Sequence, residues 1–514
     1  MNRKIVFFLI SVILTAVSTA MLVSGVLSLF LDPLPGAIRL CGCGSVLLAL
    51  SAVCAILLRP RNEAEKSAGM REGFAIVGLS WLAATLAGMV PYILVSGFHW
   101  YDAFFETASG FSTTGASIVD SNLKLWNGNS LPKGVESLSY GILFWRSLTQ
   151  WLGGMGIVVL SLAILPLMNI GGQMLYNAEV SGIKSIKSKL APRIADTAKI
   201  LWIVYVLLTV LQSLLLRFGG MGWFDSVCHS MCTLASGGFS TKQLSVAHWG
   251  SSYIEWIMVI FMYLAGCNFV LHFHVIRKGF KSYLKDEEFR FYAIVVLIAS
   301  AIIAVSLLFN QNMVKEDPIS GLKYAENISG SIRASVFQVV SIITTTGFTT
   351  ANYTLWPGVA CVIVYLLMFI TACGGSTTGG IKCVRILLMG KYAISEIRRC
   401  LFPHMVQDIR ISGIRYENAT IQKTIGFCSL FIMLFFLGAM LVAAVSPGMS
   451  LPTAFSASIS CIANVGPGFD QIGPDCSFSW MPAAAKVILG FEMLLGRLEL
   501  YTLLVLLMPS FWRR

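Results

Sequence analysis

The chain has 514 residues, of which 56% are hydrophobic and 12% charged, and its mean hydropathy is +0.76. These values lie outside the range of soluble globular proteins and predict an all-α polytopic membrane protein. The net charge of +12 would suit a nucleic-acid-binding protein. The basic residues are instead placed as membrane topology requires, so we expect no nucleic-acid partner.

Ten segments are long and apolar enough to span a bilayer as helices. The first two, 5–31 and 40–58, contain no Asp, Glu, Lys or Arg and exceed the roughly 18 residues that mark a candidate span. The basic start Met1–Lys4 is typical of a secretory signal, but the apolar run after it is longer than a signal core. The other predicted spans are about 73–98, 139–168, 200–217, 253–276, 289–309, 357–389, 424–446 and 482–509.

The basic residues indicate which way the spans run. If both termini face the cytoplasm, the six segments on that side hold 26 of the 37 Lys and Arg residues, as the positive-inside rule requires. We therefore expect a multi-pass protein of the cytoplasmic (inner) membrane with both termini in the cytoplasm, and some contact with anionic lipid. The six segments are 1–4, 59–72, 184–199, 277–290, 382–423 and 513–514.

After two N-terminal helices, the chain repeats one unit four times: a span, a short segment that ends in small residues, and a second span. A glycine marks the same place in each unit, at intervals of 123, 109 and 119 residues. A ten-residue helix is about 15 Å long, half the hydrocarbon thickness, so each short segment must enter and leave by one face. Non-helical backbone at that depth must line water or be buried, which predicts a pseudo-four-fold arrangement around one pore. The short segments are 103–112, 226–235, 335–344 and 454–463; the regions are an N-terminal two-helix segment 1–72 and pore repeats 73–183, 184–280, 281–415 and 416–514.

The small residues after each short segment suit a selectivity filter. Rings of backbone carbonyls can replace the water shell of a monovalent cation, and glycine adopts the backbone conformations that point carbonyls at an axis. Glycine also lets membrane helices pack closely, but four copies at the same place favour a filter over packing. The predicted potassium-binding filter residues are Thr113, Thr114, Gly115, Ser236, Gly237, Gly238, Thr345, Thr346, Gly347, Asn464, Val465 and Gly466.

Two further features interrupt the apolar spans. The run 372–380 in repeat three is too rich in glycine for a straight helix and predicts a flexible break below the filter. A phosphate-binding loop is the alternative, but no Gly-Lys-Ser/Thr follows. Arg497 lies among apolar residues of the last span, where an arginine costs about 2.5–3.5 kcal/mol unless it finds a partner or water. It either pairs with Glu499 or Glu492 or faces the pore cavity, and Arg146 receives no role.

Three strings carry a resemblance to a known family: 109–116, 145–156 and 374–382. They are similar to those of the TrkH potassium-uptake proteins of bacteria, in the Trk/Ktr/HKT superfamily. The resemblance implies potassium transport, and Gly115 favours potassium because sodium-selective HKT members carry Ser there. It implies that an intramembrane loop and Arg497 gate the pore, that the protein is a homodimer, and that a cytoplasmic TrkA-like nucleotide-binding regulatory subunit docks on it. The gating residues are Gly374, Gly375, Ser376, Thr377, Thr378, Gly379, Gly380 and Arg497.

The fourth unit departs from this pattern, and several functions stay open. Asn464 and Val465 replace the hydroxyl pair and Pro467 follows the glycine, so one quadrant of the ring is unlike the others. The transported potassium ion is the expected ligand; the dispersed cysteines and histidines predict no other metal site and no organic cofactor. An enzyme is not expected, because no catalytic constellation lies at one depth. A potassium symporter coupled to sodium or protons, and a non-transporting assembly or sensor protein, are the alternatives.

Overall fold

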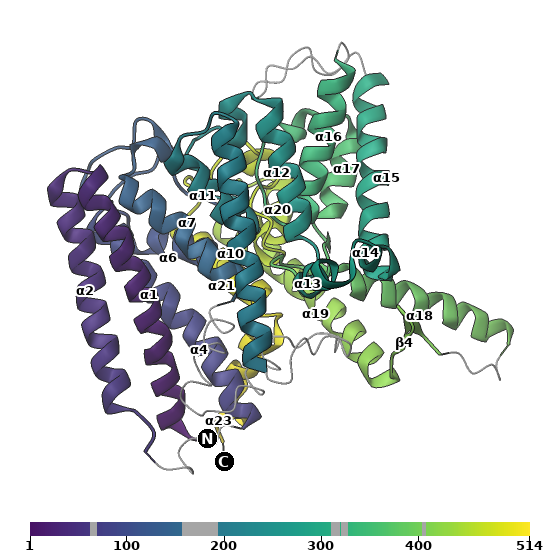
Figure 1. Ribbon diagram of the computed structural model, residues 1–514, viewed down its shortest axis with the longest axis horizontal. Helices are drawn as coiled ribbons and strands as arrows, with labels where there is room; N and C mark the ends of the chain where they lie inside the picture. Colours follow the sequence, from purple (N-terminus) through teal and green to yellow (C-terminus); the bar gives the residue numbers. More distant parts are fainter. Residues whose placement is uncertain (62–68, 157–193, 310–318, 320–326, 403–407, 514) are drawn as a thin grey trace.

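The computed structural model describes residues 1–61, 69–156, 194–309, 319, 327–402 and 408–513, and these are mostly helical. Helices α1 (Arg3–Leu31) and α2 (Leu34–Leu57) form a long antiparallel hairpin at one side of the molecule (Figure 1). The carboxylate of Asp32, between them, accepts hydrogen bonds from the backbone N–H groups of Tyr140 and Gly141, both at 2.8 Å. The hairpin is thereby tied to the first repeat.

Six helices in the described part of the chain are long and apolar enough to cross a membrane. Many of their apolar side chains are exposed, such as Ile56 and Phe218, which are 74% and 82% accessible and suit contact with lipid. The chain is therefore a multi-pass membrane protein, as its composition predicts. The six segments are α1, α2, Met70–Leu94 (α4, Met70–Gly88, with α5, Val90–Leu94), Lys199–Phe218 of α10 (Ile194–Phe218), α15 (Glu287–Phe309) and α19 (Asn418–Val445).

Each of the four predicted short segments is a helix that is largely buried. Three of them have 12 residues, whereas the third has 16 because Asn327 caps it eight residues before the predicted start. Each is followed by a second helix of the same unit. The four pairs are α6 (Trp100–Phe111) with α7 (Tyr140–Gly154), α11 (Trp223–Leu234) with α12 (Ser252–Ala265), α16 (Ile328–Ile343) with α17 (Gly358–Leu367), and α20 (Leu451–Ile462) with α21 (Ala483–Arg497).

Two of the second spans are broken where an unbroken helix is predicted. The span 253–276 bends by 101° between α12 and α13 (Phe269–Lys278). The span 482–509 ends at Arg497, because Glu499 and Leu500 take left-handed backbone angles (φ 52° and 58°), and resumes as α22 (Tyr501–Leu507) and α23 (Pro509–Trp512). In the predicted span 139–168, helix α7 already ends at Gly154. Residues 157–168 lie outside the described part, as do residues 184–193 of a predicted basic segment.

The predicted break in repeat three is present. Helix α17 ends at Leu367, and the chain continues through β1 (Ile370–Thr371), which pairs in parallel with β2 (Ile381–Lys382), into α18 (Cys383–Leu401). A second strand pair, β3 (Arg410–Ile411) and β4 (Ile414–Arg415), is antiparallel. The remaining described helices are α14 (Lys281–Lys285) and the 3-10 turns η1 (Gly134–Ser137), η3 (Ser245–Trp249), η5 (Tyr353–Leu355) and η6 (Asp470–Ile472).

The apolar core has two main parts. One joins the N-terminal hairpin to the first and fourth units, with Trp81, Trp145 and Phe105 among its buried side chains. The other joins the second, third and fourth units and includes Phe337 and Val465. The short helices contribute to both parts: α6 to the first, α16 to the second and α20 to both.

Candidate functional site

The four short helices end in the same backbone geometry. At each C-terminus one residue is left-handed: Thr113, Ser236, Thr345 and Asn464 have φ between 52° and 57°. The next N–H then donates back to a carbonyl of the helix at 2.8–2.9 Å, as in the caps that end many helices. The four bonds are Thr114 N to Ser109 O, Gly237 N to Cys232 O, Thr346 N to Ser341 O and Val465 N to Ser460 O. The backbone of each unit therefore reverses direction at the same place.

Two residues after the cap, each unit has a left-handed glycine, and the four glycines form a ring. A Cβ added to any of them would lie nearer than 3.0 Å to a backbone oxygen of another loop. Gly115 meets Gly237 O, Gly238 meets Thr346 O, Gly347 meets Val465 O, and Gly466 returns to Thr114 O. Both the backbone angle and the space require glycine at all four positions. The structure thus brings the twelve predicted filter residues together in one closed circuit.

A small cavity opens on one side of this ring. The mouth cavity has a volume of about 100 Å³ and is lined by all four glycines, together with Arg146, Lys242 and Asp475. A larger cavity of about 940 Å³ shares Gln243, Asp475, Cys476 and Ser477 with it. The ring therefore faces an open, polar vestibule on this side.

The predicted gating loop, 374–380, lies on the other side of the ring. The Thr377 hydroxyl hydrogen-bonds the Ser236 hydroxyl at 2.7 Å, and Gly379 N donates to Thr345 Oγ1 at 3.0 Å. Gly379 also packs against Asn464, since an added Cβ would lie 2.7 Å from Asn464 Cβ. The loop thus contacts the left-handed caps of units two, three and four.

Arg497 supplies the connection to the first unit. Its Nη2 donates to the carbonyls of Gly153 and Gly154, at the end of α7, at 2.7 and 2.8 Å, and its Nη1 donates to the carbonyl of Thr377. The two carboxylates predicted as alternative partners are engaged elsewhere: Glu499 pairs with Arg385 at 2.7 Å, and Glu492 accepts from Ser458 Oγ at 3.2 Å. Arg497 bonds the backbone of the 374–380 loop.

The bend in the second unit is where the loop enters. Cys373 N donates to Gly266 O at 3.0 Å, and Phe269 N donates to Gly375 O at 3.1 Å, on either side of the break between α12 and α13. Lys382 Nζ donates to both oxygens of Thr378, at 2.6 Å for the hydroxyl, and closes the loop on itself. The unpredicted bend therefore accommodates the loop of the neighbouring unit.

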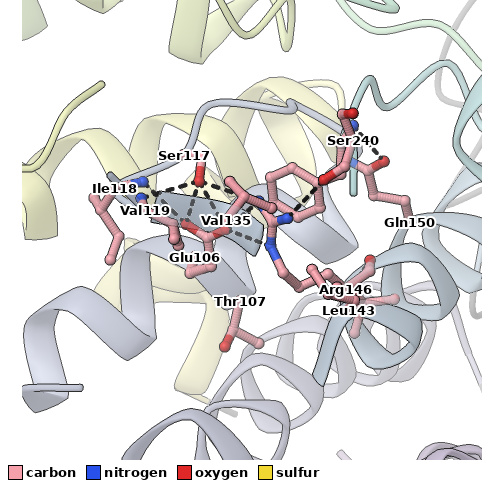
Figure 2. Close-up of polar contacts among 12 residues, drawn as sticks. Glu106, Thr107, Ser117, Ile118, Val119, Val135, Leu143, Arg146, Gln150 and Ser240 are labelled. Atoms are coloured by element: carbon pink, nitrogen blue, oxygen red, sulfur yellow. Dashed lines mark hydrogen bonds and ion pairs between the residues drawn. The ribbon is translucent and has the colours of Figure 1, made fainter. Parts of the chain in front are cut away.

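A buried ion pair beside the ring is not predicted from the sequence. Arg146 on α7 lies 2.8 Å from Glu106 on α6, and the two are 2% and 0% accessible. Figure 2 shows how they hold the chain that leaves the filter: Glu106 accepts from Ile118 N at 3.0 Å, and Arg146 donates to Ser240 O at 3.1 Å. The pair thus joins units one and two. The sequence offers one indication of it: Glu106 is a carboxylate within the short segment 103–112, which is predicted to enter the membrane.

Gln150, also on α7, brackets the second loop. Its Nε2 donates to Gly237 O at 2.7 Å, and its Oε1 accepts from Phe239 N at 3.0 Å. The same amide thus fixes the peptides on both sides of Gly238. These contacts are made in unit two, where Gly237 replaces the second hydroxyl residue found in units one and three.

The fourth unit is held differently. The Asn464 amide donates to Thr114 Oγ1 and to Met493 O, both at 2.9 Å, so its side chain joins the fourth cap to the first. At the other end of α20, the hydroxyls of Ser450 and then Thr453 donate to Asp470, which lowers the pKa of that carboxyl. Asn464, which replaces a hydroxyl residue of the other units, therefore links unit four to unit one by a hydrogen bond.

Comparisons with known proteins agree with this architecture. Residues 45–514 match the TrkH family, described as a cation transport protein. Potassium uptake proteins TrkH of Salmonella typhimurium and Escherichia coli are each 38% identical to the chain over 466 residues, which is 90% of either sequence. The Escherichia coli protein TrkG is 32% identical over 446 residues, 86% of each. The crystal structure of the potassium transporter TrkH from Vibrio parahaemolyticus aligns with a TM-score of 0.83 at 32% identity, covering 100% of both chains.

Proposed function

Because the chain belongs to the TrkH family of cation transport proteins, we propose that it takes up potassium ions through the ring of four loops. The observation that carries this proposal is the closed circuit in which each filter glycine faces a carbonyl of the next unit. Four equivalent backbone segments around one axis offer carbonyl oxygens in place of the ion's water shell. The named relatives are potassium uptake proteins, which supports potassium as the substrate.

The ends of the short helices assist the same ion. Helix C-termini carry partial negative charge, and all four end at the ring. Paired Glu106 and Arg146 hold the loops of units one and two without a net charge at the mouth. Selectivity then comes from carbonyl positions rather than from a ring of carboxylates.

In this proposal the 374–380 loop is the gate. Its contacts with the caps of three units, and with α7 through Arg497, support a position across the path on the far side of the ring from the mouth cavity. Opening requires these contacts to break together. Displacement of the loop, rather than of the ring, then changes flux.

The family also suggests how the protein is assembled. We place it in the cytoplasmic (inner) membrane as a homodimer with both termini in the cytoplasm, where a TrkA-like nucleotide-binding regulatory subunit docks. Mass measurement in detergent tests the dimer, and co-purification with the regulatory subunit tests the docking. A monomer in both lipid nanodiscs and mild detergent would contradict the dimer.

Potassium and sodium flux into proteoliposomes tests the function. The parent should pass potassium in preference to sodium without an added proton or sodium gradient, and Gly115→Ser should narrow that preference. Flux that requires sodium or a proton gradient would favour coupled transport instead. No potassium flux under any gradient would overturn the proposal.

A further inference from the structure

One carboxylate oxygen is bonded both to the first residue of the 374–380 loop and to the start of α18, the helix that follows the loop. Glu288, the second residue of α15, accepts at Oε1 from the backbone N–H of Gly374 at 2.6 Å and from that of Val384 at 3.1 Å. Gly374 is the first residue of the loop, and Val384 is the second residue of α18. The segment between them, which contains the whole loop, is therefore closed by a single side chain from another helix.

The two donors differ in what they would otherwise bind. Val384 N belongs to the first turn of α18, where N–H groups lack partners within the helix and favour a negative charge. Gly374 N lies outside any helix. The start of the loop cannot leave its position without breaking the bond to Gly374 or moving α15 with it.

Glu287, the residue before Glu288, contacts α18 and the β3–β4 hairpin. Glu287 Oε2 lies 2.6 Å from Lys391 Nζ on α18, and Glu287 N donates to Ser412 Oγ, in the turn between β3 and β4, at 2.9 Å. Lys391 also donates to Arg410 O at 2.6 Å. Two adjacent residues of α15 thus contact the loop, α18 and the hairpin.

Helix α18 and the β3–β4 hairpin form one packed arm. Leu388 of α18 shares a small apolar core with Ile409, Ile411 and Ile421. The rest of α18 extends away from the helices of the four units (Figure 1). A force that displaces this arm reaches Glu287 and Glu288 through the contacts above.

We propose that Glu288 is a positioning residue that latches the start of the 374–380 loop to the first turn of α18 and so couples the loop to the arm. The inference rests on the proposed function in that it takes this loop as the gate. A carboxylate that served only to cap α18 would need the bond to Val384 alone. The bond to Gly374 distinguishes the latch from the cap.

Single-channel recording of the reconstituted full chain tests the latch. Glu288→Ala should raise the open probability about tenfold, since two hydrogen bonds to one buried carboxyl oxygen are lost, with single-channel conductance and potassium preference as in the parent. Glu288→Gln keeps an acceptor oxygen and should give a smaller rise. Glu417→Gln removes an exposed carboxylate at the start of α19 and should match the parent. Parent-like open probability in both Glu288 variants would overturn the latch.

Hydrogen exchange supplies a readout that does not depend on transport. In Glu288→Gln, the amides of Gly374 and Val384 should both exchange faster than in the parent, resolved by overlapping peptides. Faster exchange at Val384 alone would overturn the latch in favour of a cap. If the parent passes no potassium, the proposed function fails, while the exchange result still decides whether Glu288 holds the loop.

Discussion

The ring and the loop on its far side are built by opposite means. Each quadrant of the ring is made locally: a short helix, a left-handed cap and a left-handed glycine within one unit, repeated four times. The 374–380 loop occurs in one unit. Besides contacts within that unit, it is held by residues of units two and four: Ser236, Phe269 at the α12–α13 bend, and Arg497. The difference teaches that the backbone of the repeated part is set within each unit, whereas the position of the unique part depends on contacts from other units.

The largest expected effect comes from a side chain in the ring. Gly115→Ala places a Cβ against Gly237 O and should lower potassium flux strongly and, like Gly115→Ser, narrow the preference for potassium over sodium, because the loops of units one and two must separate. Gly128→Ala is the matched control: its φ is also positive, 76°, but an added Cβ there meets open space. Both variants carry backbone strain of about 1–2 kcal/mol. Equal flux in the two would show that ring contact is not required.

Next in size is the loss of Arg497. Arg497→Ala removes donors to Thr377, Gly153 and Gly154 and should raise basal flux about tenfold, as expected when hydrogen bonds from a charged donor are lost. Arg497→Lys should give a smaller change, because a lysine keeps a charged donor, but not parent behaviour, because it cannot reproduce the planar fork. Flux and membrane expression are measured together; equal losses in both would indicate a folding role only.

Loss of the buried pair Arg146–Glu106 should lower the free energy of unfolding more than it changes gating. Arg146→Met alone leaves Glu106 uncompensated and should cost about 3–5 kcal/mol of unfolding free energy, whereas Arg146→Met with Glu106→Gln should cost less. Thermal unfolding in detergent measures both. If the double variant loses as much as the sum of the single ones, the two residues do not act as a pair.

Sequence reasoning located the ring but not everything that holds it. The Ser/Thr/Gly strings after apolar segments of half-membrane length predict the caps, because both signals are local. The breaks after Ala265 and Arg497 were missed: Glu499 and Leu500 are left-handed in a place where Glu499 pairs with Arg385, a contact between distant segments. The pairing of Arg146 with Glu106 required knowing which helices meet.

The smallest expected effect concerns the fourth cap. Asn464→Gly accommodates the left-handed angle but loses the bonds to Thr114 and Met493, and should lower stability by about 1 kcal/mol. Asn464→Ala loses the same bonds and adds backbone strain, so it should lower stability further. Potassium preference should fall modestly in both. An unchanged preference would mean that this cross-link does not shape the ring.

The most direct test of the ring as the ion path uses Cys476, an exposed residue that lines both cavities at its mouth. Cys54 and Cys400 are also exposed and are first replaced by Ser. A cationic thiol reagent should then label Cys476 and block potassium flux, and potassium flux through Cys476→Ser should persist under the same treatment. Complete labelling of Cys476 with undiminished flux would contradict passage of the ion through the ring.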